Sequence, residues 1–246
     1  REKLNEFLFN KCENKIDDYQ GLLVQAEKVR TQLSRLINST PDRIAFIDNT
    51  TNGINLLAQG IQLGKGDRVL LNDIEFPANV YPFLNLERDG IEIDWVKSSN
   101  GIVTSEEVLN QIKPETKIVS ISQVQFLSGY RVELEKIGKV CREKGIIFCV
   151  DAIQGLGAVQ LDVVKDCIDF ISCGTQKWIL GLQGLAFIYI SKDLQEKLIP
   201  KYAGWLGVEN AWSLLDYELR LKSTADGLQT GTVSVIGIYA LSASLD

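Results

Sequence analysis

The stretch GIIFCVD, residues 145–151, decides the fold, because it is an apolar run of strand length that stops at Asp151. A second stretch, CIDFISCGTQK at residues 167–177, has the same form and stops at Lys177. Residues 185–190 are apolar as well. Runs that are apolar on both alternating faces are typical of central strands, which helices cover on both sides of a sheet. We therefore predict that these runs form the centre of a mostly parallel sheet.

Strand-like and helix-like segments alternate along the rest of the chain. Strands are expected at 43–47, 68–71, 91–96, 117–122, 146–150, 167–173 and 185–190, and helices at 22–37, 52–63, 78–86, 105–112 and 133–144. The alternation predicts an α/β fold, a three-layer sandwich with a mostly parallel sheet of the seven-stranded type between helices. We expect an N-terminal helical segment at 1–40 and one large domain at 41–246.

Composition excludes several classes of function. The 246 residues carry a formal charge of −6, which argues against nucleic acid as a partner. No apolar run approaches the roughly 18–20 residues that span a bilayer. The chain has no histidine, which argues against a zinc site or a Ser-His-Asp triad. The five cysteines form no CxxC pair, so we expect them to be reduced thiols in a cytoplasmic protein. Taken with the charge, the apolar runs and the lack of histidine, this predicts no metal, no membrane contact and no nucleic-acid partner.

Asp151 and Lys177 are the residues most suggestive of chemistry. Ligands of such sheets bind beyond the carboxyl ends of the strands, where both residues lie. An amine can form an imine with an aldehyde, and a carboxylate can pair with a protonated pyridine nitrogen. The pair therefore predicts a pyridoxal 5′-phosphate site that acts at the α carbon of an amino acid. The ordinary alternatives are a helix-capping aspartate and a surface lysine at a turn.

Further residues fit the same cofactor. Thr51 and Asn52, in NTTNGIN at residues 49–55, precede a helix, where hydroxyls and free N–H groups suit a phosphate. Thr175 offers another hydroxyl, Phe76 can stack on a pyridine ring, and Gln154 can bond its phenolic oxygen. Ordinary capping and core packing are the alternatives. By contrast, the glycines at 60–66 and 155–157 match neither a phosphate loop nor a dinucleotide fingerprint, which argues against a nucleotide-binding protein.

The order of these motifs resembles that of the class V aminotransferases. The motifs are TTNGIN at 50–55, EFPAN at 75–79, VDAIQ at 150–154, QKW at 176–178 and GT at 231–232. This group of fold-type I pyridoxal phosphate enzymes includes cysteine desulfurases, selenocysteine lyases, isopenicillin N epimerase-like proteins and kynureninase. The resemblance runs from about residue 43 to the C-terminus, and it implies that the small C-terminal domain of the family is absent from this chain.

The resemblance also implies a role for each matching residue. Lys177 would hold the cofactor as a Schiff base and Asp151 would face its pyridine nitrogen. The other implied cofactor ligands are Gln154 at the phenolic oxygen, Phe76 on the ring, and Thr51, Asn52 and Thr175 at the phosphate. Thr232 would reach the phosphate of a partner subunit, which implies a homodimer with shared active sites.

Departures from the family pattern shape the expected reaction. Gln176 stands where many members have histidine before the lysine, and Phe76 stands where desulfurases have another histidine. Because glutamine cannot titrate, transamination or epimerisation of a small amino acid is favoured. Cysteine desulfurase or selenocysteine lyase activity is the alternative, and a non-catalytic scaffold is a third reading. Arg131 is either a clamp for the substrate carboxylate or a surface arginine.

Overall fold

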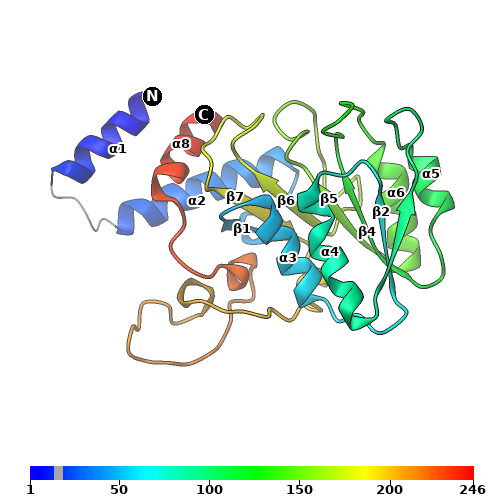
Figure 1. The fold of residues 1–246 in the computed structure, drawn as a ribbon. Coiled ribbons are helices and arrows are strands. Elements are labelled where there is room, and N and C mark those ends of the chain that lie inside the picture. Colours follow the sequence, from blue (N-terminus) through cyan, green and yellow to red (C-terminus); the bar gives the residue numbers. More distant parts are fainter. Residues whose placement is uncertain (14–18) are drawn as a thin grey trace.

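The computed structural model describes residues 1–13 and 19–246, and it contains a seven-stranded sheet between layers of helices (Figure 1). The strands are β1 (Ile44–Ile47), β2 (Arg68–Asn72), β3 (Glu92–Val96), β4 (Thr116–Ser122), β5 (Ile147–Asp151), β6 (Phe170–Gly174) and β7 (Ala186–Ile190). Their order is β1-β7-β6-β5-β4-β2-β3, and only β7 is antiparallel to its neighbours. The predicted α/β sandwich with a mostly parallel sheet is therefore confirmed.

The sheet divides the apolar core into two halves, and helices cover each of them. They are α1 (Glu2–Cys12), α2 (Tyr19–Leu36), α3 (Thr50–Gly60), α4 (Tyr81–Leu84), α5 (Ser105–Asn110), α6 (Leu134–Lys144), α7 (Lys192–Gln195) and α8 (Val235–Leu245). Side chains of α2, α5, α6 and α8 pack on one face, and those of α3, α4 and α7 pack on the other. Burial of each large apolar side chain contributes about 1.5–3 kcal/mol, so both layers hold the sheet in place.

Two elements differ from the sequence-based expectation. The strand expected from residue 167 begins only at Phe170, because Cys167 has a left-handed backbone with φ of 54° that an extended strand cannot contain. The helix expected at 78–86 is broken into α4 and flanking 3₁₀ turns at Pro77–Asn79 and Asn85–Asp89. Proline has no N–H to donate, so Pro77 and Pro82 each stand at the start of a new turn.

The chain after residue 202 is irregular, as expected, until α8 begins. It contains 3₁₀ turns at Trp205–Gly207 and Ala225–Leu228 and an isolated bridge between Val208 and Leu221. At the other end of the chain, α2 buries Val29 and Leu33 in the same core as the sheet. The boundary at residue 40 stays a prediction. None of the helices in the described part of the chain is long and apolar enough to cross a membrane.

The carboxyl ends of the central strands are polar on the face that α3 covers. In the ladder, Ser122 lies opposite Asp151 and Asp151 lies opposite Ser172. The first residue of α3 is tied to this edge, since Ser172 Oγ donates to the Thr50 carbonyl at 2.8 Å and Gly174 N donates to Thr50 Oγ1 at 3.0 Å. The N-terminus of α3 is therefore fixed beside the ends of β5 and β6.

This close approach of α3 depends on Gly53. A Cβ there would overlap Ser172 Oγ and would lie 2.6 Å from Ile47 Cδ1, whereas a Cβ at Gly64 would meet nothing closer than Asp67 Oδ2 at 3.7 Å. We expect Gly53→Ala to lower the free energy of unfolding by about 1–3 kcal/mol through overpacking. Gly64→Ala is the control and should stay within about 0.5 kcal/mol of wild type in urea titrations. Equal effects of the two changes would contradict the packing described.

Candidate active site

Lys177 lies in a tight turn just beyond β6. Thr175, which starts the turn, is buried, and its hydroxyl donates to the carbonyls of Leu182 at 3.1 Å and Leu185 at 2.9 Å. Two backbone bonds close the turn, from Leu180 N to the Lys177 carbonyl and from Gly181 N to the Thr175 carbonyl. Leu180 has a left-handed backbone with φ of 61°. This conformation costs on the order of 1 kcal/mol or more, which the surrounding hydrogen bonds must offset. The turn thus fixes the half-buried Lys177.

Asp151, the last residue of β5, is buried, with 1% of its surface exposed. Its Oδ1 accepts a hydrogen bond from Ile153 N at 3.0 Å, but Oδ2 is buried and has no partner among the described residues. Burial raises the pKa of Asp151 to about 7, and the nearby charge of Glu75 acts in the same direction. The bond from Ile153 and the positive charge of Lys177 lower this pKa. Asp151 therefore presents an unsatisfied acceptor to the site.

Phe76 brings an aromatic surface to Lys177. The Lys177 Nζ atom lies 5.7 Å from the centroid of the Phe76 ring, which packs edge-on against Phe126 at 5.3 Å. Phe76 is 44% exposed, so it is not an ordinary core residue. The structure thus gathers Lys177 and Phe76, from two separate loops, with Asp151 at the end of β5, at the carboxyl edge of the sheet.

The N-terminus of α3 supplies the place expected for a phosphate. Asn49 caps the helix by accepting a bond from Asn52 N at 2.9 Å, and the half-buried Thr51 hydroxyl makes no hydrogen bond among the described residues. The Asn52 side chain is engaged, because its Nδ2 donates to both carboxylate oxygens of Asp48, at 2.8 and 2.7 Å. Thr51 is therefore the free hydroxyl at this helix end, and Asp48 holds the amide of Asn52.

The remaining predicted cofactor ligands are Gln154, Thr175 and Thr232, and they differ in burial and in whether their side chains are hydrogen-bonded. Gln154 is half-buried and makes no hydrogen bond within the described part of the chain, so its amide is free. The Thr175 hydroxyl braces the lysine turn with both of its bonds and does not offer the free hydroxyl that a phosphate ligand needs. Thr232 is exposed and lines a cavity of about 310 Å³ together with Asn52 and Asp48.

Reasoning from sequence assigned no role to Glu75, yet this carboxylate lies buried next to Phe76 with 7% of its surface exposed. Gln125, another residue without an assigned role, donates from Nε2 to Glu75 Oε1 at 2.9 Å, and its own Oε1 is buried without a partner. The sequence signal was present, because Glu75 stands in the EFPAN motif and Gln125 lies just beyond β4, close to the strand end as Asp151 is in β5.

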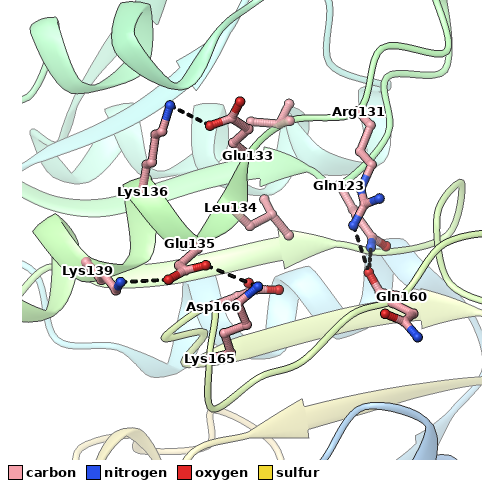
Figure 2. Close-up of a pocket in the computed structure, with 11 residues that line it drawn as sticks. Gln123, Arg131, Glu133, Leu134, Glu135, Lys136, Lys139, Gln160, Lys165 and Asp166 are labelled. Atoms are coloured by element: carbon pink, nitrogen blue, oxygen red, sulfur yellow. Dashed lines mark hydrogen bonds and ion pairs between the residues drawn. The ribbon is translucent and has the colours of Figure 1, made fainter.

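Arg131 lies elsewhere, in a cleft of about 550 Å³ beside the start of α6 (Figure 2). Figure 2 shows that its guanidinium and the Gln123 amide both point at the Gln160 carbonyl, at 3.4 and 3.0 Å. Most of the other charged residues of the cleft form ion pairs, such as Lys139 with Glu135 at 2.6 Å. Lys177 and Asp151 do not line this cleft. Arg131 is therefore not gathered with the lysine site.

Taken together, the site suits a flat, positively charged ring that carries an anionic group. A protonated ring nitrogen would satisfy the buried Asp151 Oδ2, and Phe76 offers an aromatic face beside the Lys177 amine. The N-terminus of α3, with the free Thr51 hydroxyl, is suited to a phosphate. An amine held next to such a ring can act as a nucleophile and as a proton carrier.

Comparisons with known proteins agree with this geometry. A family model described as Aminotransferase class-V matches residues 13–246. An uncharacterized aminotransferase, YcbU of Bacillus subtilis, is 27% identical over 93% of this chain and 60% of its own length. A probable cysteine desulfurase of Methanothermobacter thermautotrophicus is 29% identical over 89% of this chain and 54% of its own length. This chain thus spans little more than half the length of these curated relatives.

A solved structure has the same fold. It is the complex of the cystine C–S lyase C-DES with its product cysteine persulfide, with a TM-score of 0.88 and 23% sequence identity. The match covers 99% of this chain and 66% of the lyase.

The raised pKa of Asp151 has a measurable consequence for stability without any ligand. Between its ordinary value near 3.8 and about 7, the folded protein keeps a proton that the unfolded chain has lost, so stability falls as pH rises through this window. Asp151→Asn should remove this loss. Its free energy of unfolding relative to wild type should rise by up to about 4 kcal/mol between pH 4 and pH 8 in urea titrations. The exposed Asp89→Asn is the control, and an unchanged pH dependence in Asp151→Asn would contradict the burial described.

Proposed function

The chain belongs to the class V aminotransferase family, whose cofactor is pyridoxal 5′-phosphate, and we propose that it uses this cofactor to act at the α carbon of an amino acid. The observation that carries the proposal is the buried, unpartnered Asp151 Oδ2 close to the charge of Lys177. An unpaired buried carboxylate is costly in a protein, and a protonated pyridine nitrogen is the partner that would remove the cost. The residues present therefore fit the cofactor.

The proposed binding roles follow from the position of each side chain. Asp151 would accept the hydrogen bond of the ring nitrogen, Phe76 would cover a ring face, and Lys177 would hold the aldehyde carbon covalently. Thr51 and the N–H groups at the start of α3 would bind the phosphate, and Asn52 would take part only by leaving Asp48. Gln154, whose amide is free, would bond the phenolic oxygen.

The bound cofactor supplies an electron sink that stabilises negative charge at the substrate α carbon. Lys177 would have two tasks: its amine would hold the cofactor, and it would also move a proton at the substrate α carbon. Asp151 would keep the ring nitrogen protonated, because a positive partner would stabilise its buried carboxylate. The turn braced by Thr175 limits how far the Lys177 amine can move.

Transamination or epimerisation is our first choice of reaction. The residue before Lys177 is the exposed Gln176, whose amide has no titrating group to assist a second proton transfer. Transamination needs a base on one face of the ring only, which Lys177 would supply, whereas epimerisation also needs a proton donor on the opposite face. The second candidate is removal of sulfur from cysteine or a related amino acid, and it is favoured by the names of several relatives, which are probable cysteine desulfurases. We also propose a homodimer, in which Thr232 would serve the partner's phosphate site.

The cofactor proposal is tested by borohydride reduction of the purified protein after loading with pyridoxal phosphate. Wild type should show a visible absorption band and, after reduction, a single peptide containing modified Lys177. Lys177→Ala should lose the covalent adduct, while the exposed Lys165→Ala should keep it. Absence of a band at saturating cofactor, or an adduct that survives in Lys177→Ala, would refute the proposal.

The reaction class is tested by product analysis with a panel of amino acids. We expect keto acid formation from, or racemisation of, a small amino acid, with at least tenfold less sulfide or persulfide from cysteine or cystine. Gln176→His should raise any sulfur release, because it restores a titrating group beside Lys177. Sulfur release by wild type that exceeds every other reaction would favour the second candidate.

A further inference from the structure

Glu75 is the most heavily hydrogen-bonded side chain at the site. Its carboxylate accepts five hydrogen bonds from the ends of β2 and β4 and from the Pro77–Asn79 turn. The donors are Asn72 Nδ2 at 2.6 Å, Ser122 N at 2.8 Å, Gln125 Nε2 at 2.9 Å, Asn79 Nδ2 at 3.1 Å and the Ser122 hydroxyl. No carboxylate oxygen of Glu75 is left without a donor.

These donors favour the negatively charged form of Glu75. Four of them are N–H groups, and the amides of Asn72 and Asn79 are oriented by other bonds, since Asn72 Oδ1 accepts from Ile74 N and Asn79 Oδ1 accepts from Ser120 Oγ. Of the five partners only the Ser122 hydroxyl could accept a hydrogen from a protonated carboxyl, whereas the four N–H groups can only donate. None of the ion pairs among the described residues involves Glu75. It is therefore a buried anion without a cation of its own.

Glu75 lies near Asp151, because Ser122, which donates two hydrogen bonds to Glu75, lies opposite Asp151 in the β4–β5 ladder. The charged groups that act on Asp151 are Glu75, which disfavours its ionisation, and Lys177, which favours it. The thiols of Cys149 and Cys173 are also close enough to be influenced by the charge of Asp151, but burial raises the pKa of Cys149 to about 12 and that of Cys173 well above its usual value, so both are neutral. With one amine for two carboxylates, the pocket has an excess of negative charge.

We propose that Glu75 is a positioning residue whose fixed negative charge keeps a proton in the Asp151 pocket, on the carboxyl group in the empty site and on the ring nitrogen when the site is filled. The inference rests on the proposed function for the identity of the ring. The Glu75 carboxylate also accepts a hydrogen bond from Gln125, which fixes the position of that side chain. In the chain, Glu75 directly precedes Phe76.

The rival explanation is that Glu75 only braces the loop. The two are separated by Glu75→Gln, which removes the charge and retains the shape, and by Ser122→Ala, which removes a donor and retains the charge. The readout is the titration of Asp151 in the cofactor-free protein, followed by NMR of ¹³C-labelled aspartate carboxyl groups and assigned with Asp151→Asn. It requires neither cofactor nor activity, so its failure is distinct from failure of the borohydride test.

We expect the Asp151 midpoint to move to lower pH in Glu75→Gln and to stay at the wild-type value in Ser122→Ala. An unmoved midpoint in Glu75→Gln, or equal shifts in both variants, would overturn the proposal. Wild-type protein with ¹³C-labelled glutamate gives a second test if Glu75→Gln fails to fold. Glu75 should then be ionised throughout the range in which Asp151 titrates, and a protonated Glu75 in that range would also overturn the proposal.

Discussion

The buried carboxylate of Asp151 is the constraint on which the rest of the site depends. One of its oxygens has a backbone partner and the other has none among the described residues, so the ionised form is disfavoured in the isolated chain. Glu75 increases that penalty instead of relieving it. A site that holds two buried carboxylates beside one lysine is built for a positively charged ligand, and the family's cofactor brings such a charge in its protonated ring. Local instability and binding capacity thus have the same physical origin.

The fold supports this arrangement by bringing rigid elements to one edge of the sheet. The ends of β5 and β6 fix Asp151 and the start of the lysine turn, and Gly53 lets α3 approach β6 closely enough for Thr50 to bond Gly174. Phe76 is held by the Glu75 network that joins β2 to β4. Each functional side chain therefore lies at or just beyond the end of a buried strand, or at the start of a docked helix, which limits its freedom.

Most of the fold and several site residues could be predicted from sequence, because apolar runs indicate strands and the residues at the ends of these runs lie at the functional edge of the sheet. The strand runs, Asp151, Lys177 and the Phe76 loop were all visible in that way. The direction of a short polar side chain is not visible, which is why Thr175 was expected at a phosphate although its hydroxyl turns to the Leu182 and Leu185 carbonyls. Likewise, the hydrogen bonds from the Asn52 amide to Asp48, four residues earlier, could not be read from the motif. Glu75 was missed because its donors come from three separate segments.

A crystal structure of the protein with pyridoxal 5′-phosphate tests the central claim most directly. The account predicts continuous density from Lys177 Nζ to the cofactor and a separation of about 2.7–2.9 Å between Asp151 Oδ2 and the ring nitrogen, as in charge-assisted hydrogen bonds. The phosphate should lie at the N-terminus of α3. A cofactor whose ring nitrogen faces away from Asp151, or one bound at another edge of the sheet, would contradict the account.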